Sequence, residues 1–579
     1  MVVGAGPCDK GQRSGIILGK FFLKEDTMPD AKYDAVVVGG GHHGTIIACY
    51  LQKAGLKTAI FERWHEIGGG ACGEELPLPG FTQNVCAHLT RFFAHPAYSD
   101  FNLRDYGLVY TFPEHNEAWI FPDGRYLMGE TVWKVEDPHT GKAAFSEEAA
   151  QHNLNEIARF SQRDADMTEE IIRKFKARWI DAFRKYRYSG PEEWGAKDPL
   201  EELCDDPKDG IDPRYQDMTV GETTYELFES PEMRTLFMRA MQTSNGLFPD
   251  DPCGLYWIVH VLGLALSLES AAIVQGGTHS ITHSLLRAFG GMGGEFFVLS
   301  EVEKILSEGG VTKGIKLKDG TEIGADIVIS DLSINLTFDL LGKDNVPRDQ
   351  WDKVQWLLDN AYERCQLFWG NIALYEPPKY SANPDLGWVP RLYLGECDPE
   401  YYTSGAYKKE RWEQGIGNQL YLLVCPDSMW DKTRAPEGRW TALIESFTCP
   451  WKHFSERDWL RMKREIVDRM IKEMHEYAPN VTKDNLLEAW IATPDDVVNR
   501  NPCMPGGGWG GLDSPPGRLG KLRPIPELSG YRMPVKNVYL CSSAAHSSHG
   551  IGRGSSYACY KTITRDFDLS YRPWEGRAY

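Results

Sequence analysis

Residues 33–44 read YDAVVVGGGHHG, and this stretch decides the fold. Its first six residues form an apolar, β-branched run that is typical of a buried parallel strand. Gly39, Gly41 and Gly44 follow at once with G-x-G-x-x-G spacing. Such spacing allows a tight turn, the close approach of a pyrophosphate, and close packing of the next helix on the strand. The stretch therefore predicts the start of a Rossmann-type dinucleotide-binding domain.

The residues after the glycine loop complete a first βαβ unit. Residues 45–53 have helical character, and Gly55 ends the helix. Residues 57–61 form a second strand that leads into Glu62. An acidic residue about 20 positions after the glycine motif binds ribose hydroxyls in such domains. We therefore expect Gly39, Gly41, Gly44 and Glu62 to contact the ADP half of a dinucleotide.

Composition and charge exclude several other classes of protein. The chain has 579 residues, 63 Lys and Arg against 82 Asp and Glu, and a net charge of −19, which disfavours nucleic acid as a partner. Its 42% hydrophobic and 25% charged residues are typical of a folded globular protein. The 13 cysteines include no C-x-x-C, and the histidines show no metal-ligand spacing, so we expect reduced thiols and no metal site.

The location of the protein is predicted from its apolar segments. The longest nearly apolar stretch, residues 255–268, is shorter than the roughly 20 residues of a membrane span. It is either a buried helix, which we favour, or a helix that dips into a membrane or lines a tunnel. Charged residues interrupt the N-terminal segment, so no signal peptide is expected. We predict a cytoplasmic protein and leave open peripheral contact with a membrane.

Further strands and glycine loops are spread along the chain. A second glycine loop contains Gly68 and Gly69, and strands are expected over residues 296–299 and 325–330. A hairpin over residues 316–323 turns at Asp319-Gly320. Near the end, residues 537–541 form a short strand, followed by a loop rich in Ser, His and Gly and by a helix from about Ser556.

Together these motifs resemble the FAD-dependent phytoene desaturase-like oxidoreductases. That family includes carotenoid desaturases and isomerases and bacterial limonene dehydrogenase. The resemblance extends over nearly all of the chain after residue 33. It is carried by residues 39–44 with Glu62, the loop at 68–69, the region 276–294, Pro426-Asp427, residues 435–438, Thr493-Pro494, Arg523-Pro524, and the terminal strand, loop and helix.

The resemblance implies FAD as the cofactor and assigns residues to it. The first glycine loop and Glu62 would bind the ADP half, the second glycine loop would lie beside the flavin, and the terminal loop and helix would hold the pyrophosphate and isoalloxazine. The implied contacts are Gly39, Gly41, Gly44, Glu62, Gly68, Gly69, Val302, Gly550 and Ile551. The chain departs from the family pattern at Ser542-Ser543, at residues 547–549, and at Asn84, where an acidic residue is common.

The expected fold class is α/β, with two interwoven domains. A Rossmann-type FAD-binding domain is built from three discontinuous segments, and an α+β substrate-binding domain is built from the parts between them. We assign residues 1–30 to an N-terminal tail, residues 31–140, 268–345 and 495–579 to the FAD-binding domain, and residues 141–267 and 346–494 to the substrate-binding domain. The second domain should contain helices within 147–183, strands over 366–374 and 419–424, and an amphipathic helix over 458–477.

The implied function is removal of hydride from an allylic C–H of an apolar, isoprenoid-like substrate, by desaturation, dehydrogenation or hydroxylation. His549 or His546 would accept the proton. Electrons would pass to a quinone, another carrier or oxygen. Whether the protein works with a partner subunit is left open. The alternatives are a redox-neutral isomerase, a flavin amine oxidase, and a non-catalytic FAD-binding protein that acts through protein contacts.

Two further residues have two interpretations each. His88 is either a loop anchor or part of the site lining. Arg553 either offsets the charge of the pyrophosphate or reduced flavin, or pairs with a surface acid.

Overall fold

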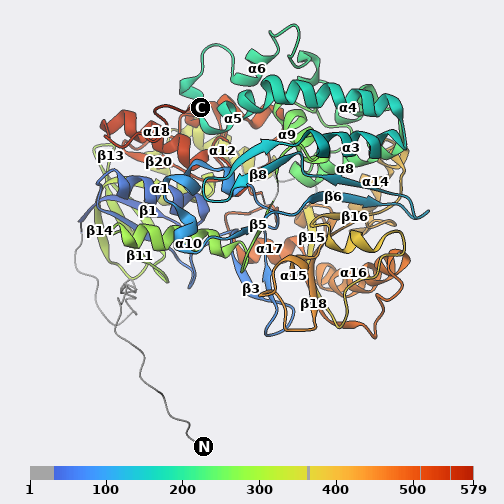
Figure 1. Cartoon of the computed structure of the whole chain (residues 1–579). Coiled ribbons are helices and arrows are strands. Elements are labelled where there is room, and N and C mark those ends of the chain that lie inside the picture. Colours follow the sequence, from blue (N-terminus) through green and yellow to red (C-terminus); the bar gives the residue numbers. More distant parts are fainter. Residues whose placement is uncertain (1–31, 271, 361–365, 509, 548–549, 578–579) are drawn as a thin grey trace, which may run out of the picture.

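The computed structural model describes residues 32–270, 272–360, 366–508, 510–547 and 550–577. Figure 1 shows two sheets, one formed around β1 and β14 and the other around β15 and β18, with a layer of helices that includes α3, α4 and α6 beside them. The expected α/β class is confirmed. The N-terminal tail of residues 1–30 and the candidate base His549 lie outside the described residues.

The first sheet combines segments that are far apart in the sequence. Its strand order is β11-β2-β1-β14-β13-β12, and β20 pairs with β14. The strands are β1 (Lys32–Val38), β2 (Thr58–Phe61), β11 (Glu295–Phe297), β12 (Val302–Glu308), β13 (Val311–Leu317), β14 (Glu322–Ser330) and β20 (Val538–Leu540). β1 runs parallel to β2 and β14, and β20 runs parallel to β14. The predicted hairpin is the antiparallel β13–β14 pair.

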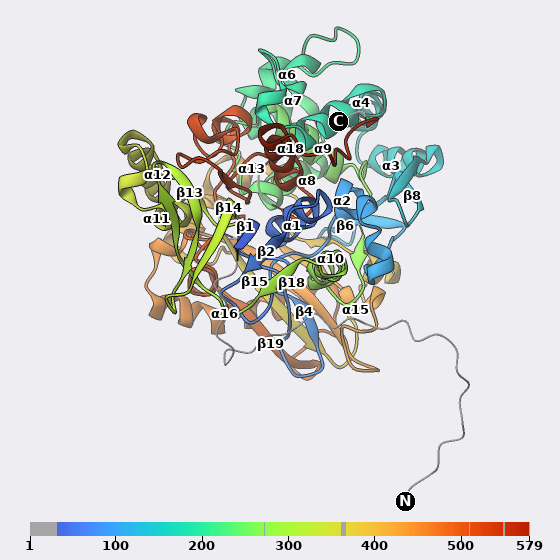
Figure 2. The ribbon, with the colours of Figure 1, turned by 90° about the vertical axis from the view of Figure 1, so that its left-hand side faces the viewer.

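Three helices cover the parallel part of this sheet. They are α1 (His42–Lys53), α10 (His279–Gly291) and α18 (Ser555–Phe567), and both α10 and α18 contact α1 (Figure 2). The β-branched residues of β1 are buried, as expected for a strand covered by helices. α1 begins at His42, directly after the loop, so its N-terminus points at the site where a phosphate would bind.

The second sheet lies across from the first. Its order is β19-β15-β18-β17-β16-β6-β7, and every pair is antiparallel except β16–β6. The strands are β6 (His115–Ile120), β7 (Tyr126–Glu130), β15 (Gln366–Leu374), β16 (Leu392–Leu394), β17 (Leu422–Cys425), β18 (Trp440–Thr448) and β19 (Leu486–Ala492). β6 and β7 come from within residues 31–140, which the sequence assigns to the FAD-binding domain. The chain therefore enters the second sheet earlier than the predicted boundary.

One long helix covers the outer face of the second sheet. α16 (Glu456–Tyr477) buries Trp459, Ile466 and Met470 among apolar residues of this sheet. The Ser455 hydroxyl accepts a hydrogen bond from the Asp458 backbone N–H, so the helix begins with a capping box. The predicted amphipathic helix is therefore confirmed.

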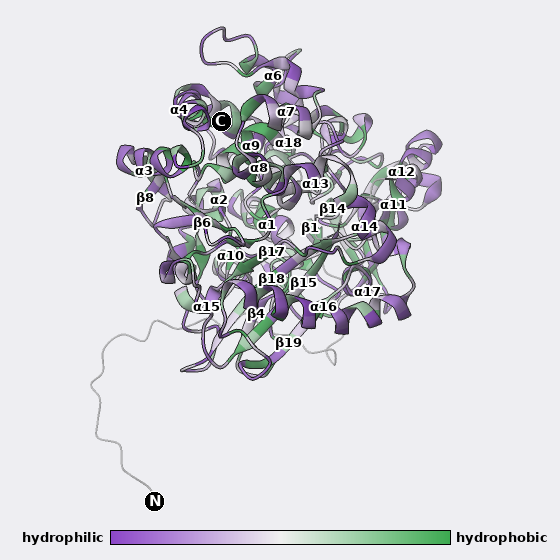
Figure 3. Cartoon of the chain, turned by 90° about the vertical axis from the view of Figure 1, so that its right-hand side faces the viewer, coloured by the Kyte–Doolittle hydropathy of each residue, from purple (hydrophilic) through white to green (hydrophobic). Residues whose placement is uncertain are grey.

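The apolar stretch at 255–268 forms a buried helix. Residues 255–264 of α9 (Leu255–Ala265) are all buried, and Figure 3 shows α9 in hydrophobic colours, whereas the surface helix α14 (Ala406–Gln414) is hydrophilic. The buried-helix interpretation is confirmed, and the alternative of a membrane-dipping helix is wrong. Within the described ranges no helix is long and apolar enough to cross a membrane.

Gly290 offers a test of the fold near the end of α10. The residue is exposed and helical, and an added Cβ would meet no atom within 4 Å. We expect Gly290→Ala to raise the free energy of unfolding by about 0.5–1 kcal/mol, because alanine loses less backbone entropy in a helix. Urea denaturation measures the change. Gly254→Ala is the contrasting variant and should destabilise, because Gly254 has φ +78° and its Cβ would lie 2.5 Å from Pro516 Cγ.

Candidate functional site

A cavity of about 700 Å³ lies between the two sheets. One side is formed by the carboxyl ends of β1, β2 and β14, where ligands bind in open α/β sheets. The other side is formed by the inner face of the second sheet, from β15, β17 and β18. The volume is within the range of cofactor and ligand pockets, about 300–1,000 Å³.

The two glycine loops meet at the first side of this cavity. Gly39 has φ +94°, which favours glycine, and the Gly39 N–H donates to the Phe61 carbonyl at 2.9 Å. Gly41 pairs with Gly68 in an isolated parallel bridge, and a Cβ on Gly69 would lie 3.0 Å from Gly41 Cα. This close backbone approach leaves N–H groups at the start of α1 available to a phosphate.

Gly44 has a different role in the loop. It does not line the cavity, and a Cβ there would lie 2.5 Å from the Gly39 carbonyl oxygen. Gly44 therefore acts through the close packing of α1 on the glycine turn. Gly39, Gly41, Glu62, Gly68, Gly69, Val302, Gly550 and Ile551, the other predicted cofactor contacts, all line the cavity.

Glu62 holds the end of β2 in place. Its carboxylate accepts hydrogen bonds from the Gly40 N–H and the Trp64 N–H, each at 2.8 Å. A carboxylate has about four acceptor positions, so Glu62 keeps positions for two ribose hydroxyls.

Asp331 is a cavity residue that sequence reasoning missed. It follows β14 directly, and its carboxylate accepts a hydrogen bond from the Gly44 N–H at 2.9 Å. Burial raises the pKa of Asp331 well above its ordinary value, although the Gly44 hydrogen bond opposes the shift. The position after a buried parallel strand was the signal available in the sequence, because such residues lie at the ligand-binding edge of the sheet.

This geometry predicts that Asp331→Asn strengthens binding of the dinucleotide. The amide oxygen keeps the hydrogen bond from Gly44, and a negative charge beside the pyrophosphate position disappears. We expect a gain of about tenfold or more in FAD affinity at pH 8, measured by reconstitution of the flavin-free protein. Because the raised pKa leaves more of the wild-type carboxyl neutral as pH falls, the substitution removes less charge at pH 5 and the gain should shrink there. An equal gain at both pH values would contradict the charge argument.

The terminal loop is fixed by a buried arginine. Arg523 is fully buried, and its guanidinium donates to the carbonyls of Ser543, Ala545 and Leu512 at 2.6, 3.1 and 2.9 Å. These bonds place Ser542, Ser543 and Ala544 at the cavity wall. The serines that depart from the family pattern therefore belong to the lining.

His546 lies in this loop but away from the cavity. It is fully buried and absent from the lining, and its Nε2 lies 2.9 Å from the Tyr186 carbonyl oxygen. Its ring packs edge-on against Tyr186 and Trp194, each with ring centroids 4.9 Å apart. Burial lowers the pKa of His546 to about 4, so the ring is neutral at pH 7. The structure gives His546 the contacts of a loop anchor.

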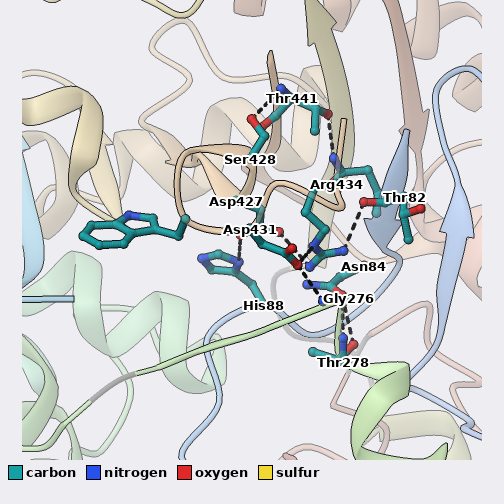
Figure 4. Close-up of polar contacts among 12 residues, drawn as sticks. Thr82, Asn84, His88, Gly276, Thr278, Asp427, Ser428, Asp431, Arg434 and Thr441 are labelled. Atoms are coloured by element: carbon teal, nitrogen blue, oxygen red, sulfur yellow. Dashed lines mark hydrogen bonds and ion pairs between the residues drawn. The ribbon is translucent and has the colours of Figure 1, made fainter. Parts of the chain in front are cut away.

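His88 lies at the cavity wall and belongs to a buried polar network (Figure 4). Its Nε2 lies 3.1 Å from the Pro390 carbonyl oxygen, and its Nδ1 lies 2.9 Å from Asp427 Oδ1. The residue therefore combines both predicted roles, loop anchor and site lining.

Arg434 holds the rest of this network together. Its guanidinium lies 3.2 Å from carboxylate oxygens of both Asp427 and Asp431, and all three side chains are at most 1% exposed. Asp431 in turn accepts a hydrogen bond from the Gly276 N–H at 2.6 Å. The network thus joins the segment after β17 to the segment before α10.

Asn84 lies next to this network. Its Oδ1 accepts hydrogen bonds from the Thr278 N–H at 2.9 Å and the Thr278 hydroxyl at 3.2 Å (Figure 4). The amide oxygen therefore fixes the same segment before α10. Asp427 and Asp431 already supply Arg434 with two carboxylates, so this network needs no third acid at position 84.

Arg553 reaches the helical layer rather than a surface acid. It contacts the Tyr256 hydroxyl, and its Nη2 lies 3.0 Å from His260 Nε2, both on the buried helix α9. Arg553 therefore connects the terminal loop with that layer. Among the described residues, no group of three or more His, Cys, Asp or Glu side chains is arranged to hold a metal ion.

The inner half of the cavity is mainly apolar. Trp369, Leu423, Leu443 and Phe447 line it from the second sheet, together with Glu445. The helical layer adds Gln242, Thr243 and Ser244 from the end of α8 (Pro231–Asn245). The cavity therefore joins a glycine-lined region to an apolar region with a few polar groups.

Comparisons with known proteins agree with this arrangement. Residues 37–102 match the NAD(P)-binding Rossmann-like domain. The chain is 26% identical to pyridine nucleotide-disulfide oxidoreductase domain-containing protein 2 of Rattus norvegicus, covering 92% of this chain and 94% of that protein. It is 24% identical to a limonene dehydrogenase subunit of Castellaniella defragrans, covering 93% and 95%. It is 25% identical to the neurosporene-forming phytoene desaturase of Rhodobacter capsulatus, covering 80% and 82%.

The fold also resembles solved structures. An oxidoreductase from Methanosarcina mazei aligns with a TM-score of 0.55 and 15% identity, covering 92% of this chain and 99% of that one. The Rossmann-like domain and the dehydrogenase and desaturases among the relatives indicate an oxidoreductase with a flavin-type dinucleotide cofactor. The relatives include a limonene dehydrogenase subunit and phytoene desaturases, so they support the phytoene desaturase-like oxidoreductase family that the motifs predicted.

Proposed function

We propose that the protein is an FAD-dependent oxidoreductase that removes hydride from an allylic C–H of an apolar isoprenoid or terpene-like substrate, by desaturation, dehydrogenation or hydroxylation. The observation that carries the proposal is a continuous cavity in which two glycine loops face an apolar region. Limonene and phytoene, which appear in the names of two relatives, are substrates of this class.

The residues present fit FAD. A Cβ on Gly41 would come within 2.5 Å of the Asp331 carboxylate, so the space beside the start of α1 suits a pyrophosphate only because side chains are absent there. Gly39, Gly41 and Glu62 would hold the ADP half, with Gly44 supporting the turn. Gly68, Gly69, Val302, Gly550 and Ile551 would surround the remainder. When bound, oxidised flavin supplies a two-electron acceptor.

The side chains around the substrate would act by orienting it and excluding water. Trp369, Leu423, Leu443 and Phe447 offer an apolar wall against which a hydrocarbon body can lie without losing hydrogen bonds. His549 stays the proposed proton acceptor, and His546 anchors the loop that carries it. The electron acceptor would be a quinone, another carrier or oxygen.

A spectroscopic experiment tests this function. The purified protein should show an oxidised-flavin absorption band, and anaerobic addition of a terpene or carotenoid precursor such as limonene or phytoene should bleach it. Bound flavin that no member of the panel bleaches would argue instead for an isomerase or a non-catalytic protein. A purified protein that neither contains flavin nor binds added FAD would overturn the proposal.

A further inference from the structure

Glu445 is a buried carboxylate in the apolar wall of the cavity. It lies on β18, is 4% exposed, and lines the cavity. Its cross-strand neighbours are Trp369 on β15 and Leu423 on β17. Leu443 and Phe447, two positions away on the same strand, face the same side. One acid therefore projects from a largely apolar surface, to which Gln366 and Arg391 add polar side chains at its edge.

The Glu445 carboxylate is open to the cavity, because its oxygens are not among the enclosed polar atoms that lack a partner, and no hydrogen bond to a described residue acts on it. Two arginines act on Glu445 through their charge, but the hydrogen bonds of their guanidinium groups go to other residues. Arg391 lies 2.7 Å from Glu117 and 2.6 Å from the Tyr393 hydroxyl. The Arg239 guanidinium donates to the Tyr421 carbonyl at 2.7 Å and lies 4.1 Å from the centre of the Phe447 ring.

Glu445 becomes costly when an apolar ligand fills the cavity and displaces the water that its carboxylate would contact. Burial raises the pKa of Glu445, and the charges of Arg239, Arg391 and His88 oppose this shift without supplying a hydrogen bond. Buried polar groups in proteins are almost always hydrogen-bonded, because an unpaired one loses its interaction with water. An unpaired carboxylate at a cavity wall therefore indicates a ligand that supplies the missing donor.

Ser244 is a second polar group of this kind. The residue lines the cavity near the end of α8, and its hydroxyl is enclosed without a hydrogen-bond partner among the described residues. A wall built only for a hydrocarbon needs neither group, since each could be replaced by an apolar side chain without loss of contact. Two unpaired polar groups in one cavity therefore suggest a polar part on the ligand.

We propose that the substrate is amphipathic, with a hydrogen-bond-donating head, either a hydroxyl or a protonated amine, bound by Glu445 and an isoprenoid body lying along Trp369, Leu423 and Phe447. The inference rests on the proposed function and narrows its substrate class from hydrocarbons to substrates with such a head. A hydroxyl fits both protonation states of Glu445, because it donates to the carboxylate and accepts from the neutral acid. A carboxylate head would be repelled by the ionised form.

Four probes with one carbon skeleton test the proposal: farnesol, farnesylamine, farnesene and farnesoate. Their dissociation constants for the flavin-loaded protein are measured from changes in the flavin spectrum and, independently, in tryptophan fluorescence. Farnesol or farnesylamine should bind about tenfold or more tightly than farnesene, since a hydrogen bond to a charged group contributes about 1.5–3 kcal/mol. Farnesoate should bind most weakly.

Two variants of Glu445 assign the preference to this residue. Glu445→Leu should bind farnesene at least as well as the wild type and should lose the preference for the polar heads. Glu445→Gln keeps an acceptor but no charge, so it should retain part of the preference for farnesol and lose any additional preference for farnesylamine. The comparison of these two probes thus identifies the head as a hydroxyl or an ammonium group.

Glu473→Gln is the matched control. Glu473 is a half-buried acid on α16, whose carboxylate accepts a hydrogen bond from the Leu420 N–H at 3.0 Å and which does not line the cavity. Its substitution should leave the order of the four probes unchanged. Equal binding of all four probes to the wild type would overturn the proposal while leaving the isoprenoid pocket intact, as would a preference that survives in Glu445→Leu. Failure of all four probes to bind would overturn the isoprenoid substrate and this inference with it.

Discussion

Gly44→Val is expected to yield a folded protein that contains less than about one tenth of the wild-type flavin. A Cβ at position 44 would lie 2.5 Å from the Gly39 carbonyl oxygen and 2.8 Å from Asp331 Oδ2. The first of these atoms belongs to the backbone of the turn, so α1 has to move away from β1. The N–H groups that would bind the pyrophosphate move with it, and their alignment with the phosphate is lost.

The flavin content after purification, measured from the ratio of visible to protein absorbance, checks this result. Gly55→Ala is the matched control in the same βαβ unit. Gly55 has φ +93°, so alanine costs about 1 kcal/mol of stability, but nothing lies within 4 Å of the added Cβ and the residue does not line the cavity. The control should therefore keep its flavin. A Gly44→Val protein with full flavin content would show that the dinucleotide does not depend on this turn.

The parts of the fold that follow from local sequence patterns are predictable. The glycine loop after β1, the turn at Asp319-Gly320 and the amphipathic pattern of α16 each depend on residues close together in the chain. The side chains of such segments fix their own conformation through turn geometry, capping or periodic burial. The same holds for Gly39, Gly41 and Glu62, whose spacing alone places them around one end of a parallel sheet.

The wall of the cavity that the second sheet forms cannot be predicted in this way. Arg391 and Glu117 are far apart in the sequence and meet because β16 pairs in parallel with β6. Glu445 lies in a strand with mostly apolar neighbours, and only the position of the first sheet decides which face of that strand borders the cavity. These contacts depend on the pairing of strands that are far apart in the sequence. The spacing of residues within one segment therefore does not reveal them.

The same limit applies to the terminal loop. The sequence predicts His546 and His549 as bases from their position beside the expected flavin site. Because the His546 ring fits between Tyr186 and Trp194, from a different part of the chain, it is turned away from the cavity. Conversely, the sequence shows Arg523 only as part of a family motif. Its role in fixing the loop becomes visible in the structure, where the fold brings its carbonyl partners next to it.

Arg434→Met is expected to lower the free energy of unfolding by about 3–5 kcal/mol at pH 7. Arg434, Asp427 and Asp431 are each at most 1% exposed, and removal of the guanidinium leaves two buried carboxylates without their shared cation. The hydrogen bond from Gly276 to Asp431 and the contact of Asp427 with His88 do not replace this charge. Urea denaturation followed by circular dichroism measures the loss, and the substitution of exposed Arg348 by Met serves as the surface control.

The loss should depend on pH in a defined direction. In the wild type, burial raises the pKa of Asp427, but the charges of His88 and Arg434 outweigh it, so the pKa lies below its ordinary value. Ionised Asp427 therefore stabilises the wild type above the ordinary pKa of about 4, and this contribution fades as pH falls below it. Without Arg434, the burial of Asp427 has less opposition, Asp427 favours its neutral form, and the variant loses stability as pH rises. The difference between variant and wild type should thus be smaller at pH 4 than at pH 7.

A triple variant separates charge from packing. Asp427→Asn and Asp431→Asn, combined with Arg434→Met, remove both unpaired carboxylates and should recover a large part of the lost stability at pH 7, because breaking a buried ion pair costs more than replacing the whole group by neutral residues. If the triple variant is no more stable than Arg434→Met alone, the guanidinium acts through its shape and its hydrogen bond to the Thr82 carbonyl rather than through its charge. Recovery would instead identify the three charges as the electrostatic connection that holds the second sheet against the segment before α10.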